Sequence, residues 1–175
     1  MAFSMVQRVS APDRVQAALS AAGVAARIEE FPSSTRTAQE AAAAVGTSVG
    51  QIVKSLVFLA GGAPVLALVS GANQLDTARL AALTGTQIGK ADADAVRQAT
   101  GYAIGGVPPT GFPEPIPTFI DRDLLQYDVV WAAAGTPRHV FPIAPQDLVR
   151  ITGGRVAELK PPPYPPREGE GKSHG

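Results

Sequence analysis

The stretch "IVKSLVFLAGGAPVLALVSG", residues 52–71, contains two apolar runs that are separated by two glycines, an alanine and a proline. Val, Ile and Phe favour the half-buried surface of a strand, and a short glycine-containing connection reverses the chain between paired strands. The stretch therefore predicts a β-hairpin. One charged residue, Lys54, interrupts the first run.

Helix signals lie on both sides of this hairpin. "SAPDRVQAALSAAG" (10–23) and "TAQEAAAAVG" (37–46) each begin with a capping residue and end with a glycine, which is the pattern of a capped helix. Three later stretches follow similar rules, namely 76–85, 92–101 and 144–154. We expect five helices at these places.

Strands are expected between and after the helices, in "VAARIEEF" (24–31), "IPTFIDRDLL" (116–125), "DVVWAAAG" (128–135) and "RHVFPI" (138–143). Because helices and strands interleave irregularly, the sequence predicts an α+β fold with a mixed, largely antiparallel sheet and surrounding helices. A doubly wound sheet is not favoured.

Length and composition predict one domain over residues 1–159. The remaining segment, 160–175, is rich in proline and then in glycine and charged residues. Such a composition buries little apolar surface, so we expect an extended, disordered tail.

Several classes of function are disfavoured by composition. The chain has no cysteine and only two histidines, His139 and His174, so neither a metal site nor a cofactor is expected. Its formal net charge of +0 disfavours a non-specific nucleic-acid binder. No apolar run is long enough for a membrane span, and the first residues lack a secretory signal, so we expect a cytoplasmic protein.

Two short motifs fail on context. "GTSVG" (46–50) matches the G-x-S-x-G pattern of serine hydrolases, but a helix precedes it and a strand follows, which reverses the required order. "GTQIGKA" (85–91) is one residue short of a phosphate-binding loop and lacks the Ser or Thr that binds magnesium.

Two features remain open to a functional or a structural interpretation. Lys54 either faces solvent from its strand or points its ammonium into a cleft as a donor for a carbonyl or phosphate oxygen. "TGYAIGGVPPTG" (100–111) either makes tight turns at a sheet edge or brings backbone N–H groups close to a ligand.

Taken together, these stretches resemble the YbaK/prolyl-tRNA synthetase-associated editing domain family. The resemblance covers about residues 14–153 and is carried by "TAQEAAAAVG", "QIVKSLVF", "PVLALVSGANQLDTARLAALTG", "ATGYAIGGVPP" and "PTFIDRDLL", in that order. The lysine in the central strand, followed by the glycine-proline loop, is its most specific part.

The resemblance implies that Lys54 is the catalytic residue of an aminoacyl-tRNA deacylase. It also implies a substrate-binding set, which comprises Ser55, Gly105, Gly106, Val107, Pro108, Pro109, Gly135 and His139. For His139, a surface or packing role is an equal alternative. The family clears wrong amino acids from tRNA, chiefly tRNA for proline, by attack of water on the ester.

The expected partners are mischarged tRNA and prolyl-tRNA synthetase, and the sequence does not fix the oligomeric state. Ser55 follows the lysine where members that act on alanyl-tRNA tend to carry Asn and members that act on cysteinyl-tRNA carry Thr. Strict alanine specificity is therefore not expected. The alternative function is a non-catalytic module that binds an aminoacyl-tRNA end or a synthetase through the same groove, and a third is an unrelated hydrolase that uses "GTSVG".

Overall fold

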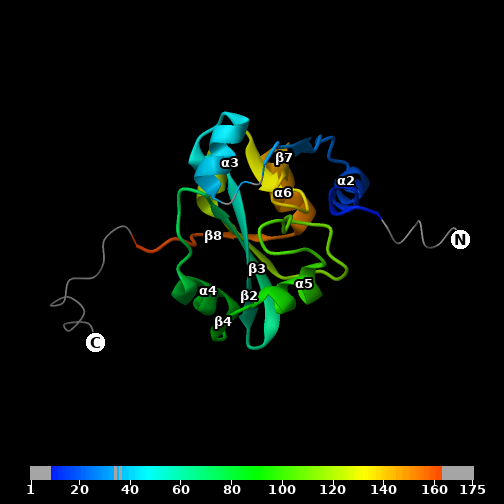
Figure 1. Cartoon of the computed structure of the whole chain (residues 1–175). Helices are drawn as coiled ribbons and strands as arrows, with labels where there is room; N and C mark the ends of the chain where they lie inside the picture. The colour runs from blue at the N-terminus through cyan, green and yellow to red at the C-terminus, as the bar shows by residue number, and fades with distance from the viewer. Residues whose placement is uncertain (1–8, 34, 36, 163–175) are drawn as a thin grey trace, which may run out of the picture.

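A long β-hairpin lies at the centre of the protein (Figure 1). The computed structural model describes residues 9–33, 35 and 37–162. Strands β2 (Val53–Ala60) and β3 (Ala63–Ser70) pair antiparallel along their whole length, from Val53 opposite Ser70 to Ala60 opposite Ala63. Gly61 and Gly62 form the turn with φ values of 58° and 88°, a conformation that favours glycine.

The hairpin belongs to a five-stranded sheet with the order β4-β2-β3-β5-β8. Its other members are β4 (Ile88–Lys90), β5 (Thr118–Asp121) and β8 (Arg155–Ala157). β5 pairs parallel with both β3 and β8, whereas β4 pairs antiparallel with β2. The α+β fold with a mixed sheet is thus confirmed, and its strands include parallel neighbours.

A smaller sheet of three antiparallel strands, in the order β1-β7-β6, lies beside the beginning of β2. Its strands are β1 (Glu29–Glu30), β6 (Val130–Ala133) and β7 (His139–Ile143). A single parallel bridge between Ile52 and Trp131 connects the two sheets. This junction positions the site described below.

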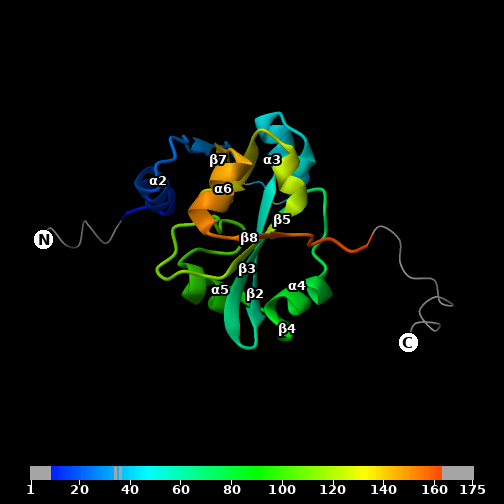
Figure 2. The same cartoon turned by 180° about the vertical axis from the view of Figure 1, so that it is seen from behind.

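Within the described residues, five helices surround the sheets, and they lie at different ends and sides of the hairpin (Figures 1 and 2). They are α2 (Ala11–Ala21), α3 (Ala38–Val45), α4 (Thr77–Thr84), α5 (Ala93–Thr100) and α6 (Pro145–Thr152). Two short 3-10 turns are η1 (Val49–Gln51) and η2 (Arg122–Gln126). The capping signals act as expected: the Thr37 hydroxyl accepts the Glu40 N–H at 3.0 Å, and Gly46 ends α3 with φ 74°.

The two faces of β3 contribute to two hydrophobic cores. Leu66 and Leu68 point into the larger core with Val15 of α2 and Leu148 of α6. The alternate positions, including Val65, pack on the other face against α4. This alternation, with period two, means that both faces of the central strand are buried. Burial of this strand places the hairpin rigidly in the fold.

The structure differs from the sequence expectations in three strands. The expected strand over 24–31 shrinks to Glu29–Glu30, because Val24 and Ala26 instead hydrogen-bond to Leu19 and to the Gln16 side chain of α2. The strands β4 and β8 lie in stretches that periodicity did not identify.

In the part of the chain that the structure describes, no helix is long and apolar enough to cross a membrane. Residues 163–175 of the expected tail lie outside the described residues.

Candidate functional site

A cavity of about 300 Å³ opens at the junction of the two sheets, beside α3 and the glycine-proline loop. Its polar or loop lining comprises Thr35, Thr37, Lys54, Ser55, Gly105, Thr136, Pro137 and His139. The rest is apolar and comprises Ala38, Ala41, Val45, Ile52, Val53, Leu56, Ile104, Val107, Trp131, Ala132, Ala133 and Val140. A mostly apolar cleft with a few convergent polar groups is typical of a small-ligand site.

The edge of β2 explains why two consecutive side chains reach the same cavity. Successive residues of a strand point to opposite faces of its sheet, so Lys54 and Ser55 are on different faces. β4 pairs with β2 only from Phe58 to Ala60. β6 approaches the beginning of β2 through the bridge between Ile52 and Trp131, and Lys54 and Ser55 both line the cavity beside this part of the strand.

The Lys54 side chain is half-buried, and its ammonium donates a hydrogen bond to the main-chain carbonyl of Asn73, beyond the end of β3. Burial lowers the pKa of Lys54 from its ordinary value, and the negative charge of Asp121 acts in the opposite direction. Lys54 thus lines the cavity, and its ammonium is held by the carbonyl of a residue that does not line it.

Ser55 lies next to Lys54 in the lining. Its hydroxyl oxygen is buried and has no hydrogen-bond partner among the described residues. A buried hydroxyl without a partner carries a desolvation cost. A polar group of a ligand in this cavity would remove that cost, which makes Ser55 a good candidate for contact with a substrate.

The loop that carries the glycines is held firmly at its base. Tyr102 is 1% exposed, its hydroxyl donates to the Gly111 carbonyl at 3.0 Å, and the Thr100 hydroxyl accepts the Tyr102 N–H. The Arg14 guanidinium lies 4.6 Å from the centre of the tyrosine ring, within the range of a cation–π interaction. The loop tip is thus presented from a fixed base.

The adjacent glycines of the tip have different roles. Gly105 lines the cavity with φ 91°, and no backbone hydrogen bond of its N–H occurs within the described residues. The Gly106 N–H is donated to the Ala103 carbonyl at 3.0 Å. Of the expected pair of N–H groups, the one of Gly106 closes a turn, and the one of Gly105 has no hydrogen-bond partner among the described residues.

Gly106 is also the place where two loops meet. A Cβ at this position would lie 2.6 Å from the Cα of Thr136, and the Gly106 carbonyl accepts the Gly135 N–H at 2.9 Å. Gly135, with φ 98°, is itself pressed against Ala11. Both glycines are buried behind the cavity wall and outside its lining, which assigns them to the support of the wall.

The remaining loop positions also divide into one that lines the cavity and others that are buried outside its lining. Val107 is 4% exposed and lines the cavity. Pro108 and Pro109 are buried and do not line it. Pro109 instead lines a second cavity, of about 360 Å³, on the other side of the loop. The prolines therefore shape the loop from behind.

His139 lines the cavity from the first position of β7. Its Nδ1 lies 2.5 Å from the Thr136 hydroxyl, and its Nε2 lies 3.8 Å from Glu30 Oε1. These two neighbours fix the ring in the wall. Thr35 closes the wall further, since its N–H and hydroxyl both donate to the Pro137 carbonyl.

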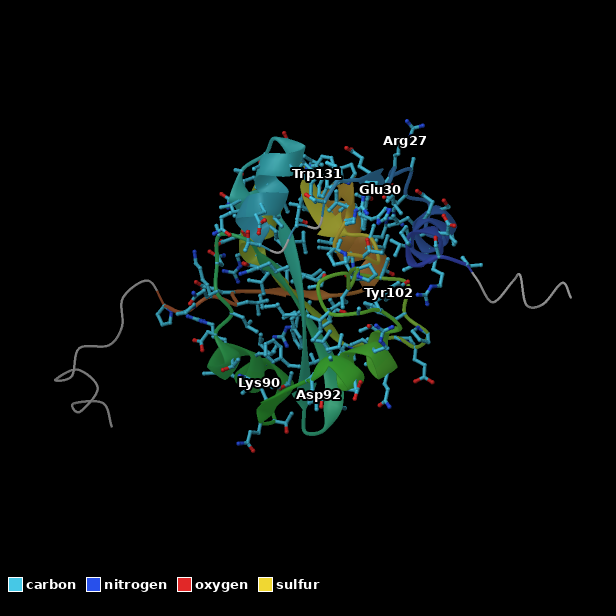
Figure 3. The ribbon with its side chains drawn as sticks, in the orientation of Figure 1. Arg27, Glu30, Lys90, Asp92, Tyr102 and Trp131 are labelled. Atoms are coloured by element: carbon cyan, nitrogen blue, oxygen red, sulfur yellow. The ribbon has the colours of Figure 1, made fainter. Side chains whose placement is uncertain are left out.

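Sequence reasoning missed the apolar wall opposite Lys54. Ala38, Ala41 and Val45 come from one face of α3, and Trp131 packs against that helix (Figure 3). The signal was present in the spacing of these three positions, which places them on one side of a helix. What the sequence did not reveal is that β6 would bring Trp131 to this helix.

The rejected motifs stay outside the site. Ser48 of "GTSVG" donates its hydroxyl hydrogen to Gln51 Oε1 at 2.9 Å within a turn that follows the C-cap of α3. Lys90 of "GTQIGKA" is exposed in β4. In the described part of the chain, no group of three or more His, Cys, Asp or Glu residues is arranged to hold a metal ion.

Comparisons with known proteins agree with this geometry. Residues 32–151 match the family described as "Aminoacyl-tRNA editing domain". EbsC of Enterococcus faecalis, assigned as a Cys-tRNA(Pro)/Cys-tRNA(Cys) deacylase, is 29% identical over 125 residues, which cover 70% of this chain and 76% of EbsC. A proline–tRNA ligase of Streptococcus sanguinis is 35% identical over 88 residues, which cover 50% of this chain and 14% of the ligase.

A solved structure is also closely similar. A crystal structure assigned as a trans-editing enzyme for prolyl-tRNA synthetase is 50% identical, with a TM-score of 0.84. The match covers 87% of this chain and 98% of that chain. The likeness thus extends over nearly the whole of the other protein.

Proposed function

Since the chain belongs to the family of aminoacyl-tRNA editing domains and is an aminoacyl-tRNA deacylase, we propose that its substrate is tRNA-Pro charged with a small amino acid other than proline. One observation carries the proposal. Lys54 and Gly105, far apart in the sequence, line one cavity together with small and apolar side chains.

In the proposed reaction, water attacks the carbonyl carbon of the ester at the tRNA 3′ end. The C–O bond to the ribose then breaks, the ribose oxygen takes up a proton, and the free amino acid leaves. The Ser55 hydroxyl has no hydrogen-bond partner among the described residues, so no base is placed to activate it. The Thr136 hydroxyl lies 2.5 Å from His139 Nδ1 in the same lining. In our proposal this pair holds the histidine ring in the wall, and water is the nucleophile.

Two groups are suited to the negative charge that develops on the carbonyl oxygen. Gly105 lines the cavity, and its N–H has no hydrogen-bond partner within the described part of the chain; backbone N–H donors of this kind stabilise an oxyanion. The Lys54 ammonium supplies a compact positive charge. In our proposal, Gly105 binds the carbonyl oxygen, and Lys54 orients the carbonyl or the terminal nucleotide.

The size and chemistry of the cavity favour a small amino acid. A volume of about 300 Å³ is at the lower end for a ligand site. The wall formed by Ala38, Ala41 and Val45 is apolar, and Ser55 adds one hydroxyl for a polar group. Ser55 and His139 are therefore the proposed contacts that select the substrate, together with Val107 in the loop.

A panel of tRNAs tests the proposed substrate. tRNA-Pro charged with Ala, Cys, Ser or Pro is incubated with the protein, and loss of the labelled amino acid is followed over time. Ala, Cys and Ser on their own tRNAs serve as the control. Faster loss from tRNA-Pro that carries a small non-cognate amino acid supports the proposal. Binding without any turnover would instead indicate a non-catalytic module.

The neutral net charge suggests that another protein contributes to tRNA recognition. We propose prolyl-tRNA synthetase as that partner, acting in the cytoplasm, where tRNA is charged. Addition of the synthetase to the assay should increase the preference for tRNA-Pro over other tRNAs. An unchanged preference would assign tRNA selection to this chain alone.

A further inference from the structure

The turn between β3 and α4 holds the ammonium of Lys54 from outside the cavity lining. Residues 71–76 form this turn, and it is fixed at both ends. The Gly71 N–H donates to the Ile52 carbonyl at 2.7 Å, and the Asp76 N–H donates to the Leu159 carbonyl at 2.7 Å. Between these anchors, the carbonyl of Asn73 accepts the Lys54 ammonium.

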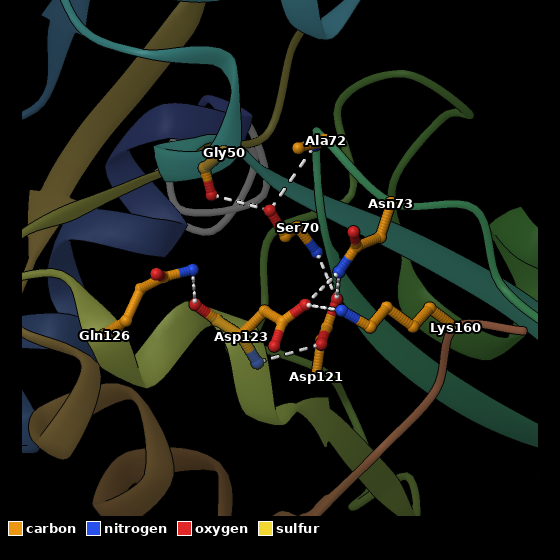
Figure 4. Close-up of polar contacts among 8 residues, drawn as sticks. All are labelled: Gly50, Ser70, Ala72, Asn73, Asp121, Asp123, Gln126 and Lys160. Carbon is orange, nitrogen blue, oxygen red and sulfur yellow. Dashed lines mark hydrogen bonds and ion pairs between the residues drawn. The ribbon is translucent and has the colours of Figure 1, made fainter. Parts of the chain in front are cut away.

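The Asn73 side chain is fixed by two carboxylates (Figure 4). Its amide nitrogen donates to Asp121 Oδ2 at 2.9 Å and to Asp123 Oδ2 at 2.8 Å. Both hydrogens of the amide are thereby used, and they point in directions set by the two acids. The position of the Asn73 main chain, and with it the carbonyl that holds Lys54, depends on this pair of hydrogen bonds.

The two carboxylates are themselves held in place. Asp121 is 1% exposed and accepts the Ser70 N–H at 3.0 Å, while its other oxygen accepts the Asp123 N–H. Lys160 donates to Asp123 Oδ2 at 2.9 Å. These bonds join the end of β3, the end of β5 and the residues after β8 into one polar cluster, which stays rigid because its members are mutually satisfied.

We propose that Asn73 is a positioning residue for Lys54, an inference that rests on the proposed function of that lysine. Its amide, held between Asp121 and Asp123, fixes the carbonyl that binds the ammonium of Lys54 beside the cavity. Asn73 does not line the cavity, so it acts on the reaction only through Lys54. The chemistry itself remains with the lysine and the loop.

The charged groups around Lys54 come from several elements. Asp121 lies at the end of β5, Asp123 in η2, and Lys160 beyond β8. His139 of β7 lies in the lining of the same cavity. Removal of the Asn73 amide changes none of these charges. Any change in the titration of Lys54 therefore comes from its altered hydrogen bond and position.

The test compares N73A with Q126A. Gln126 is an exposed amide in η2 that donates to the main-chain carbonyl of Asp123 and does not touch Asn73. Lysine carrying a ¹³C label at Cε reports the titration of Lys54 by NMR, and K54R assigns its signal among the four lysines of the chain. Single-turnover deacylation is measured for N73A in the wild-type background and in the K54A background.

In N73A we expect a fall of about tenfold or more in the deacylation rate and a lower titration midpoint for Lys54, because its charged form loses a fixed acceptor. Q126A should match wild type in both readouts. In the K54A background, N73A should cause no further loss, since coupled residues are not additive. An unchanged Lys54 titration, or the same loss with and without Lys54, would overturn the proposal.

The test separates failure of this inference from failure of the proposed function. If K54A retains full activity, the role of Lys54 in catalysis fails, while the NMR titration still decides whether Asn73 holds the lysine. If K54A is inactive and N73A behaves as Q126A does, only the inference about Asn73 fails. N73D provides a second variant, because a third carboxylate beside Asp121 and Asp123 would repel them and release the turn.

Discussion

At the scale of single residues, the site depends on a lysine whose charge is kept close to an apolar cavity. The side chain of Lys54 is half-buried, and its ammonium is satisfied by the carbonyl of Asn73. An ammonium that is shielded from water interacts more strongly with a nearby charge than one in bulk solvent. This is the physical reason why one lysine can contribute substantially to the proposed ester hydrolysis.

The lowered pKa of Lys54 predicts a pH dependence. The ammonium form is present below its pKa, so activity should fall as pH rises through that value. Burial lowers the pKa, so the fall should occur at lower pH than for an ordinary lysine. Single-turnover rates, corrected for the uncatalysed hydrolysis of the ester, measure this alkaline limb of the pH–rate profile.

D121N provides the control for the direction of this effect. The negative charge of Asp121 raises the pKa of Lys54 against the effect of burial. Its neutralisation should therefore move the alkaline limb to still lower pH. A deacylation rate that keeps rising with pH in both proteins, in proportion to the hydroxide concentration, would contradict a role for the ammonium.

Ser48 gives a prediction of no effect. Its hydroxyl bonds to Gln51 in the turn after α3 and does not line the cavity. S48A should deacylate at the wild-type rate and lose at most about 1 kcal/mol of stability from the missing turn bond. A loss of about a hundredfold or more in a folded S48A protein would restore the serine-hydrolase interpretation.

At the scale of the elements, the loop over 100–111 combines a fixed base with a glycine tip. The sequence predicts a loop that is rich in glycine and proline and that follows the strand of Lys54 in the chain. The different roles of the two glycines at the tip could not be predicted, because they depend on a contact with residues 135 and 136, far away in the chain. That contact makes Gly106 a packing position and leaves Gly105 facing the cavity.

Two glycines with similar backbone conformations separate strain from function. Gly105 has φ 91° and Gly62 in the hairpin turn has φ 88°, and neither position is crowded, since a Cβ would meet only Pro137 at 3.5 Å in the first case and nothing within 4 Å in the second. G105A and G62A should each lose about 1–3 kcal/mol of stability from backbone strain.

Only G105A should lose activity per folded molecule, by about 10²–10³-fold if its N–H is displaced from the ester oxygen. Thermal unfolding and single-turnover deacylation of both variants measure the two effects. Equal activity of folded G105A and G62A would mean that the loop tip is a turn without a part in the reaction.

At the scale of the whole molecule, the capped helices and the central hairpin could be predicted because their signals are local. Thr37 with Glu40, the terminal glycines of the helices and the Gly61–Gly62 turn all act where the sequence places them. β4 and β8 could not be predicted, because three residues carry no periodicity. They become strands by pairing with the edges of β2 and β5.

The candidate site was predictable in its parts and not in its arrangement. Lys54 and Gly105 were identified from the family resemblance, whereas the wall of α3 and Trp131 depends on how the two sheets meet at Ile52. The cluster around Asn73 was not foreseen either. Its members come from β5, η2 and the residues after β8, and only the parallel pairing of the sheet brings them together.

This cluster gives a prediction for the acid stability of the molecule. Hydrogen bonds from Lys160 and then from Asn73 lower the pKa of Asp123. A carboxyl group with a lowered pKa stabilises the fold above its unfolded-state pKa, and this contribution is lost as pH falls through its folded-state value.

D123N should therefore be less stable than wild type near neutral pH, and the two proteins should approach equal stability in acid. Urea unfolding at a series of pH values measures the difference. D147N, which alters an exposed ion pair with Arg150 on α6, is the matched control for a surface carboxylate. A difference between D123N and wild type that stays constant down to about pH 2 would contradict the assigned hydrogen bonds.

The central claim is that Lys54 acts on the ester bond of a mischarged tRNA, and one comparison tests it most directly. Wild type, K54A and K90A are assayed under single turnover with the tRNA that the wild type deacylates fastest. Lys90 is an exposed lysine of the same sheet, on β4, so K90A removes an equal charge away from the cavity. We predict that K54A folds and loses about a hundredfold or more of the rate, while K90A keeps it. Deacylation by folded K54A at the wild-type rate would contradict the claim.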